Sequence, residues 1–461
     1  MVACNCPWWW VRSFPDPQLT GPPCDHQIVS TTTLSSVLPI GSEIGPNGHL
    51  LLGGCDSVEL AREYGTPLYV MVEDDLRDRA TRFVNALQAS GLDGQVMFAS
   101  KACPVAAVCG LFAELGIGCD VTSAGELRIA LHGGVPPEGI LFHGNAKSDA
   151  DIADALSVGV GLIVVDAADE VARINAAAAS AGVHQKVLLR VTPGVEGDTI
   201  AAISTGQEDS KFGVNLIEAP AVIELIEAAD SLELVGLHLH VGSQLGDTDA
   251  IRRAAEAIAP LGSFPVVNLG GGLGVAYCDG DPQGDIEAFV AGAAAAARDC
   301  FGEGVRLMLE PGRALTAAAG VTLYSVEGVK RNVSTWVAVD GGISDNLRPL
   351  AYGSRYEALI ADRVGERPDT PARVVGKHCE SGDEIVSDAN LPAPKRGDTL
   401  AVPVTGAYGH SMANNYNAAL RPPIVLASGG KSRLIVRRER FDDLLGREIG
   451  DPVRSVGDRD A

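Results

Sequence analysis

The stretch QVMFASKACPVAAVCGLFAELGIGCDVTS, residues 95–123, decides the fold. It begins with an apolar run typical of a strand, continues through an alanine-rich segment typical of a helix, and ends in a second apolar run. Two such runs predict parallel strands, because parallel strands need a long connection that is usually a helix. The same alternation continues along the chain from Pro67 onward.

Eight strands are expected in this region. They are the runs at residues 95–100, 117–123, 139–144, 161–166, 186–192, 234–242, 265–271 and 306–312. Eight strands with intervening helices fit an α/β fold of the (β/α)8 barrel type, whose usual size is about 250 residues. An open, doubly wound sheet is the rival architecture, and the alternation alone does not exclude it.

Beyond Gly320, apolar runs follow one another with few helical intervals, which predicts a C-terminal β domain. The segment before the barrel is also poor in helix, so we expect it to join that domain and leave the barrel as an insertion. The expected bounds are 1–33 for a disordered leader, 34–74 for the N-terminal segment, 75–318 for the barrel, 319–448 for the β domain and 449–461 for a tail.

Composition narrows the classes of partner. A formal net charge of −23 argues against nucleic acid, whose binding depends on clustered Lys and Arg. The chain has no apolar run long enough to cross a bilayer. Its ten cysteines include no CxxC pair, which supports neither a disulfide framework nor a metal site. We therefore expect a cytoplasmic protein without a metal ion.

Polar residues follow the expected strands, at the end of a (β/α)8 barrel where the active site lies. They are Lys101, His143, Asp166, His240, the glycines at 270–272, Glu310 and Arg313. A medium of low dielectric weakens the preference of an amine for its charged form, so we expect Lys101 to form a Schiff base. An ordinary solvated lysine is the alternative.

The loops after the seventh and eighth strands suit an anion. The glycines of LGGGLG, residues 269–274, let backbone N–H groups approach a phosphate, which such barrels often bind there. In the next loop, Glu310 can pair with a protonated pyridine nitrogen and Arg313 can bind an oxyanion. A salt bridge between these two residues is the alternative. His240 can stack on a cofactor ring, or it is an ordinary core residue.

A thiol, Cys379, stands in GKHCESGD (376–383) of the expected β domain. Its polar neighbours and the glycine turn indicate more than packing, although a lone cysteine is more often inert than reactive.

Eleven motifs, taken together and in this order, resemble the diaminopimelate decarboxylases, a family of fold-type III enzymes that depend on pyridoxal 5′-phosphate (PLP). The resemblance extends from about Leu38 to Glu448. The motifs are FASKA (98–102), DVTSAGEL (120–127), FHGNAKS (142–148), ISTGQEDSKFGV (203–214), HLHVGSQL (238–245), LGGGLG (269–274), LEPGR (309–313), VDGGISDNLRP (339–349), YGSRYEAL (352–359), GKHCESGD (376–383) and GAYGHSMANNYN (406–417). The resemblance implies an alanine-racemase-like barrel that decarboxylates meso-2,6-diaminopimelate to L-lysine and CO2, the last step of lysine biosynthesis by the diaminopimelate pathway.

The resemblance also implies roles for the residues that hold the cofactor. Lys101 would bind PLP covalently, His240 would stack on its ring, and Glu310 would keep the pyridine nitrogen protonated. Ser243, Gly271, Gly272 and Tyr408 would hold the phosphate, with the backbone of Gly312 and Arg313 nearby.

For the substrate, the resemblance implies that the distal carboxylate is bound by Arg313, Arg348 and Tyr352, close to Tyr408. Glu380 would receive the distal ammonium. Cys379 would donate a proton to the carbanion, reaching in from the other subunit of a homodimer.

Three other activities stay open. Decarboxylation of ornithine or lysine would need acidic groups in the distal pocket, because two arginines repel a cationic substrate end. An alanine-racemase-like activity would need a tyrosine as the second base. A catalytically silent binding protein would have no need to retain Lys101, Cys379 and Glu310 together.

Overall fold

The computed structural model describes residues 34–195 and 210–449. Within them, eight parallel strands form a closed barrel: β5 (Gly94–Ala99), β6 (Gly118–Val121), β7 (Ile140–Phe142), β8 (Leu162–Val165), β9 (Gln185–Thr192), β11 (Leu232–His238), β12 (Val266–Asn268) and β13 (Arg306–Leu309). The barrel closes where Leu307 of β13 pairs with Gly94 of β5. This pairing confirms the (β/α)8 barrel and excludes the open, doubly wound sheet.

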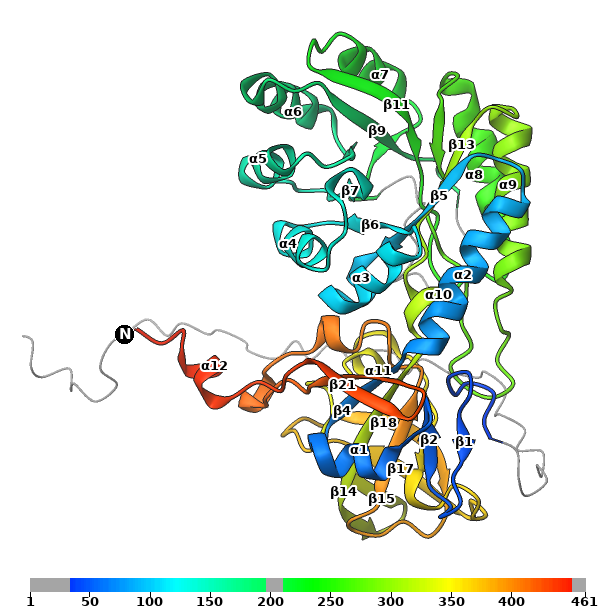
Figure 1. The fold of residues 1–461 in the computed structure, drawn as a ribbon, viewed down its shortest axis with the longest axis vertical. Helices are drawn as coiled ribbons and strands as arrows, with labels where there is room; N and C mark the ends of the chain where they lie inside the picture. Colours follow the sequence, from blue (N-terminus) through cyan, green and yellow to red (C-terminus); the bar gives the residue numbers. More distant parts are fainter. Residues whose placement is uncertain (1–33, 196–209, 450–461) are drawn as a thin grey trace, which may run out of the picture. The chain divides into compact units, whose positions relative to one another are not determined.

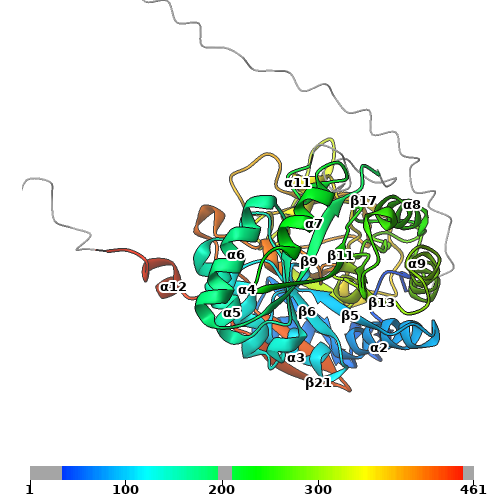
Figure 2. The same ribbon diagram turned by 90° about the horizontal axis from the view of Figure 1, so that it is seen from above.

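Helices surround the barrel (Figures 1 and 2). They are α2 (Glu73–Ala89), α3 (Ala106–Glu114), α4 (Ala124–His132), α5 (Asp149–Val158), α6 (Ala168–Ala181), α7 (Ala219–Glu227), α8 (Asp249–Ile258) and α9 (Ile286–Phe301). Local sequence sets several of their ends. Ser148 and Asp151 form a capping box at the start of α5, and Gly159 ends that helix with a φ of 77°, which glycine tolerates. A short strand, β10 (Val214–Asn215), pairs with β9.

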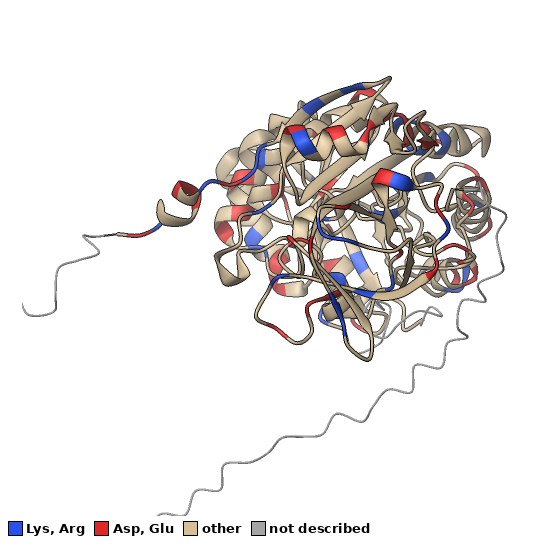
Figure 3. Ribbon diagram, turned by 90° about the horizontal axis from the view of Figure 1, so that it is seen from below, with Lys and Arg blue, Asp and Glu red and all other residues tan. Residues whose placement is uncertain are grey.

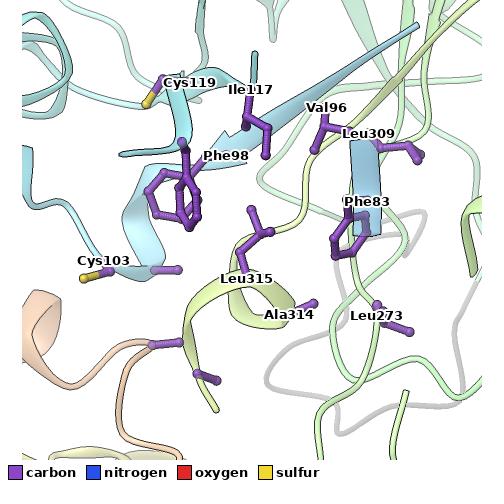
Figure 4. Close-up of a cluster of buried hydrophobic side chains, with 14 of the residues drawn as sticks. Phe83, Val96, Phe98, Cys103, Ile117, Cys119, Leu273, Leu309, Ala314 and Leu315 are labelled. Carbon is purple, nitrogen blue, oxygen red and sulfur yellow. The ribbon is translucent and has the colours of Figure 1, made fainter. Parts of the chain in front are cut away.

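Side chains fill the inside of the barrel. One buried cluster takes a residue from each of six strands: Met97, Leu141, Val164, Leu188, Val235 and Met308. A larger cluster packs outside the strands, and Figure 4 shows the part that joins Phe83 of α2, Phe98 of β5 and Leu315 of α10 (Arg313–Thr316). A packed interior leaves the end of the barrel as the place for a site.

A second sheet follows the barrel in the sequence. Its strands are β4 (Leu68–Val72), β14 (Gly320–Arg331), β15 (Thr335–Val339), β16 (Leu359–Ile360), β17 (Thr370–Val375), β18 (Glu384–Leu391), β19 (Thr399–Pro403), β20 (Ile424–Ser428) and β21 (Lys431–Val436). β4 pairs with β14 on one side and with β20 on the other. A strand that precedes the barrel in the sequence therefore lies inside the sheet that follows it.

Shorter elements complete the described chain. A small antiparallel sheet contains β1 (Glu43–Ile44), β2 (Leu50–Leu52) and β3 (Cys55–Asp56). Further helices are α1 (Ser57–Tyr64), α11 (Arg348–Tyr352) and α12 (Phe441–Leu445), with 3-10 turns η1 (Ser100–Ala102), η2 (Pro137–Gly139), η4 (Ala259–Leu261), η5 (Ala361–Arg363), η6 (His410–Met412) and η7 (Tyr416–Ala418). The N-terminal segment, expected to be poor in helix, thus contains one, which Asp56 caps by accepting from the N–H groups of Val58 and Glu59.

The predicted leader (1–33), most of the ISTGQEDSKFGV motif and nearly all of the predicted tail lie outside the described residues. None of the helices within the described residues is long and apolar enough to span a membrane. Figure 3 shows Lys and Arg interspersed with Asp and Glu along the ribbon.

Candidate active site

A cavity of about 370 Å³ is lined by residues that follow the barrel strands. It is lined by nine of the predicted site residues: Lys101, His143, His240, Ser243, Gly272, Glu310, Gly312, Arg313 and Tyr408. Its volume lies within the range of about 300–1,000 Å³ that is usual for small-molecule sites. Most of the residues that the sequence predicted to bind the cofactor therefore line one cavity.

Lys101 follows β5, in η1, and its side chain is exposed to the cavity. The backbone N–H of Tyr408 donates to the carbonyl of Ala102 (2.7 Å), which fixes a loop of the second sheet beside the lysine. Desolvation lowers the pKa of Lys101. Tyr408, Asp120 and Glu310, which are negative when ionised, raise it by more, so the pKa lies above its ordinary value. The expectation that this amine loses part of its preference for the charged form is wrong, because the neighbouring acids outweigh desolvation.

Three side chains hold the carboxylate of Glu310. Its Oε1 accepts from Asn268 Nδ2 (2.7 Å) and lies 2.8 Å from His143 Nε2, while its Oε2 lies 3.3 Å from His238 Nε2. Burial raises the pKa of Glu310, but the two histidines outweigh burial and hold it well below its usual range. The carboxylate therefore stays ionised, as the partner of a protonated pyridine nitrogen must.

Among the described residues, the predicted alternative of a salt bridge between Glu310 and Arg313 is not found. Arg313 Nη2 donates to Ser243 Oγ (3.2 Å) instead. The two residues therefore point to different partners, although both line the cavity.

His238 and Asn268 were not predicted as site residues. Each is the last residue of its strand, β11 and β12. Burial lowers the pKa of His238 to about 4, so its imidazole is neutral. The motif HLH (238–240) could have indicated His238, because residues two apart in a strand face the same side and His240 was already predicted to face the site. With His143, these side chains hold Glu310 in place; the ligand atoms of His143, His238 and Glu310 lie within 4.8 Å of one another.

His240 lies just beyond β11 and borders the glycine run. Its Nδ1 accepts from the backbone N–H of Gly271 (3.4 Å). Burial lowers the pKa of His240 well below its usual value, and the positive charges of Lys101 and Arg190 lower it further. A neutral, flat ring results, which suits stacking against a cofactor.

The glycines of the two loops leave no room for side chains. A Cβ on Gly271 would lie 2.2 Å from the carbonyl oxygen of Glu310, and one on Gly272 would lie 2.6 Å from that of Gly242. Gly272 also has a φ of 120°, which L residues rarely adopt. A Cβ on Gly312 would lie 3.1 Å from the carbonyl oxygen of Ala99. Bare backbone at this rim is what a phosphate cradle requires, so these residues fit the phosphate of PLP.

Arg313 and Arg348, both buried, converge at one point beside the cavity. The Nη1 atoms of the two side chains donate to the same atom, Tyr277 Oη, over 2.6 and 3.1 Å. The guanidinium of Arg348 also lies over the rings of Tyr408 (5.6 Å) and Tyr352 (5.9 Å). The structure thus gathers the predicted residues of the distal carboxylate site and adds Tyr277, which was not predicted.

Cys379 and Glu380 are exposed, in the loop between β17 and β18. The backbone N–H of Cys379 donates to Asn417 Oδ1 (3.0 Å), and the neighbouring His378 lines a separate cavity of about 390 Å³. Neither residue lines the cavity that contains Lys101. Within the described residues of one chain, the predicted proton donor and the predicted lysine are therefore not brought together.

Asp166, singled out by its place after the fourth strand, does not line the cavity either. Its Oδ1 lies 3.8 Å from Arg190, and its backbone N–H donates to Glu170 (2.9 Å). Arg190 does line the cavity, so Asp166 lies one contact away from it.

Comparisons with known proteins agree with this geometry. Residues 73–317 match the family model described as the pyridoxal-binding domain of pyridoxal-dependent decarboxylases. A diaminopimelate decarboxylase of Actinosynnema pretiosum is 46% identical over 89% of this chain and 95% of its own length. The Bacillus subtilis diaminopimelate decarboxylase is 43% identical over 87% of this chain and 95% of its own length.

A solved structure agrees as well. The M. jannaschii diaminopimelate decarboxylase in complex with L-lysine is 35% identical, with a TM-score of 0.83 over 89% of this chain and 98% of that one. Both the sequence and the structural likeness cover the barrel and the sheet that follows it. This chain, whose cofactor is PLP, therefore belongs to the family of diaminopimelate decarboxylases.

Proposed function

We propose that this protein decarboxylates meso-2,6-diaminopimelate to L-lysine and CO2. The observation that best supports the proposal is one cavity that combines the amine of Lys101, the ionised carboxylate of Glu310 and the guanidinium of Arg313. When bound, PLP supplies a pyridinium ring that accepts the electron pair left on the α-carbon as CO2 departs.

In this proposal each part of the cavity holds a different part of the cofactor. Lys101 forms the covalent link, His240 stacks on the ring, and Glu310 keeps the ring nitrogen protonated. The phosphate is bound by Ser243, Gly271, Gly272 and Tyr408, with the backbone of Gly312 and Arg313 nearby. His143, His238 and Asn268 keep Glu310 oriented and ionised, since all three lie within 3.3 Å of its carboxylate.

The distal end of the substrate provides the binding energy that positions the reacting end. Arg313 and Arg348 bind the distal carboxylate with Tyr352 and Tyr408, and Glu380 receives the distal ammonium. Two guanidiniums side by side suit a diacid and repel the cationic end of ornithine, which separates the proposed reaction from ornithine decarboxylation.

Cys379 is proposed as the proton donor, supplied by the partner subunit of a homodimer. Its exposure, and its absence from the cavity of its own chain, support this arrangement. An exposed thiol can reach into the cavity of a second copy, where the α-carbon takes up its proton. The expected cytoplasmic location rests on composition alone.

The test is to incubate the purified full chain with PLP and meso-diaminopimelate and to measure lysine and CO2. Equimolar production of both supports the proposal. Turnover of ornithine or lysine without turnover of diaminopimelate, or racemised diaminopimelate without CO2, would refute it.

A further inference from the structure

Two positive charges lie together in the distal carboxylate site without a negative partner. Arg313 begins α10, Arg348 begins α11, and both side chains are buried, with exposed fractions of 7% and 6%. Among the described residues, no carboxylate forms an ion pair with either guanidinium, and the Nε atoms of both have no hydrogen-bond partner. Buried charges normally need a partner, so something must keep these two side chains in place.

The group that they share is the phenol oxygen of Tyr277. It accepts from Arg313 Nη1 at 2.6 Å and from Arg348 Nη1 at 3.1 Å. The same ring lies under both guanidiniums, at 5.8 Å from Arg313 Cζ and 5.1 Å from Arg348 Cζ. Tyr277 therefore offers each cation a lone pair of its phenol oxygen.

Tyr277 is itself firmly held. Its side chain is buried, and its ring meets the ring of Tyr356 edge-on, with centroids 5.2 Å apart. Its backbone N–H donates to Asp281 Oδ2 (3.1 Å), as does that of Cys278 (2.8 Å). The glycine run at 270–272 precedes this segment closely, so one stretch of chain connects the phosphate loop to the distal site.

The hydroxyl of Tyr277 can offer the substrate a hydrogen-bond donor but no further acceptor. Its oxygen already accepts two N–H bonds, so what it has left to offer is its own hydrogen. Together with the guanidiniums, the site presents donors only. Such a site selects a carboxylate and disfavours an ammonium group.

We propose that Tyr277 is a positioning residue for the distal carboxylate, which holds Arg313 and Arg348 so that both guanidiniums bind one carboxylate group. The inference rests on the proposed function and deepens it, because it assigns part of the substrate selectivity to a residue outside the cavity lining. Tyr277 acts on binding, not on the bonds that break, so its effect falls on KM.

The test is Tyr277→Phe, which removes one oxygen atom, in the full-length enzyme loaded with PLP. The KM for meso-diaminopimelate should rise by about 10- to 100-fold, as expected for losing a hydrogen bond to a charged group, while kcat changes by less than about threefold. The visible absorbance of bound PLP should not change. Pimelate, a seven-carbon dicarboxylate, should lose inhibitory potency by a similar factor.

Tyr64→Phe is the matched control. It removes a tyrosine hydroxyl that is hydrogen-bonded to Ser432 Oγ (3.0 Å) in another part of the chain. It should leave both kinetic constants unchanged. If Tyr277→Phe does not accumulate as folded protein, Tyr356→Leu removes the ring that fixes Tyr277 and should raise KM in the same direction.

The outcomes separate this inference from the proposed function. An inactive wild type would count against the proposed function. An active wild type beside a Tyr277→Phe enzyme with unchanged KM, or with a reduced kcat alone, would overturn only the positioning role.

Discussion

The ionisation of Glu310 depends on its neighbours, because burial alone would favour the neutral acid. Glu310→Gln keeps the size of the side chain but removes the charge that stabilises a protonated pyridine nitrogen. We expect kcat to fall by about 100-fold or more, with PLP still bound, since about 3 kcal/mol of electrostatic stabilisation is typical of such groups. Steady-state kinetics and the absorbance of bound PLP measure the two effects.

Glu287→Gln is the control for this change. Glu287 lies on the outside of the barrel, paired with Arg82 (2.6 Å), and its loss should leave kcat unchanged. A Glu310→Gln enzyme with wild-type kcat would contradict the role of the carboxylate.

The thiol of Cys379 invites a comparable test. If it protonates the α-carbon, Cys379→Ala should retain PLP but lower kcat by about 10²- to 10⁴-fold, the usual contribution of a general acid. Cys300→Ala, in helix α9, should behave like the wild type. An unchanged rate in Cys379→Ala would remove this residue from the mechanism.

Sequence reasoning at the scale of single residues succeeded where a functional group directly follows a strand. Glu310 does so, Lys101 is separated from β5 by one residue, Arg313 begins the short helix α10 three residues beyond Glu310, and all three line one cavity. It did not find Tyr277, which follows the glycine run in a segment without regular structure and therefore without periodicity. It also misjudged the pKa of Lys101, because the opposing charges come from other strands and from the second sheet.

At the scale of elements, the loop after β12 contains Gly272, which has a positive φ and no space for a side chain. Gly272→Ala would place a Cβ 2.6 Å from the carbonyl oxygen of Gly242, so the loop must move. We expect PLP affinity to fall by about tenfold or more and the free energy of unfolding to fall by about 1–3 kcal/mol. Fluorescence titration with PLP and urea denaturation measure these changes.

Gly280→Ala separates backbone strain from crowding. Gly280 has a φ of 85°, but a Cβ there meets nothing within 4 Å. It should therefore lose a comparable amount of stability from strain and keep its PLP affinity. Equal losses of affinity in both variants would show that the rim of the cavity does not depend on bare backbone at Gly272.

The connection between β15 and α11 contains a buried acid, Asp345. Burial raises its pKa to about 7, against hydrogen bonds from Tyr324, Gly342 and Ser344 that lower it. Because the folded pKa lies above the unfolded one, the stability that this group contributes is present at low pH and is lost as pH rises through about 7.

We therefore expect the free energy of unfolding to decrease from about pH 4 to pH 7, by about 1 kcal/mol for each unit by which this pKa is raised. Asp345→Asn should make the dependence shallower, and the exposed Asp369→Asn should not. Urea denaturation at each pH gives the slopes. Identical slopes for the wild type and Asp345→Asn would contradict the assignment.

The barrel strands were predicted well from the sequence because parallel strands that are buried on both faces consist of short, nearly continuous apolar runs. It did not predict β10 or the sheet of β1 to β3, whose strands have only two or three residues and so too little pattern. Closure of the barrel, through the pairing of β13 with β5, depends on contacts between distant segments that no local pattern encodes.

For the whole molecule, the proposed exchange of Cys379 between subunits makes a distinct prediction. Lys101→Ala and Cys379→Ala are each expected to be nearly inactive, but a mixed dimer has one site with both residues intact. Dissociating and reassociating an equimolar mixture should restore about a quarter of the wild-type activity, since half of the dimers are mixed and each has one complete site.

Native mass spectrometry would verify that mixed dimers have formed. Verified mixed dimers that stay inactive would show that the two residues do not act across subunits. Reassociated wild-type protein, treated in the same way, controls for losses during the exchange.

The position of β4 bears on how this protein is made. Its residues 68–71 pair with residues 320–323, and residues 69–72 pair with residues 424–427. During synthesis, β4 leaves the ribosome early. Its two pairing partners, β14 and β20, are complete only after the barrel and nearly all of the remaining chain have been translated. Contacts so distant in sequence slow folding. A nascent chain that stops short of β20 would leave one side of β4 unpaired, and such an edge can pair with another chain.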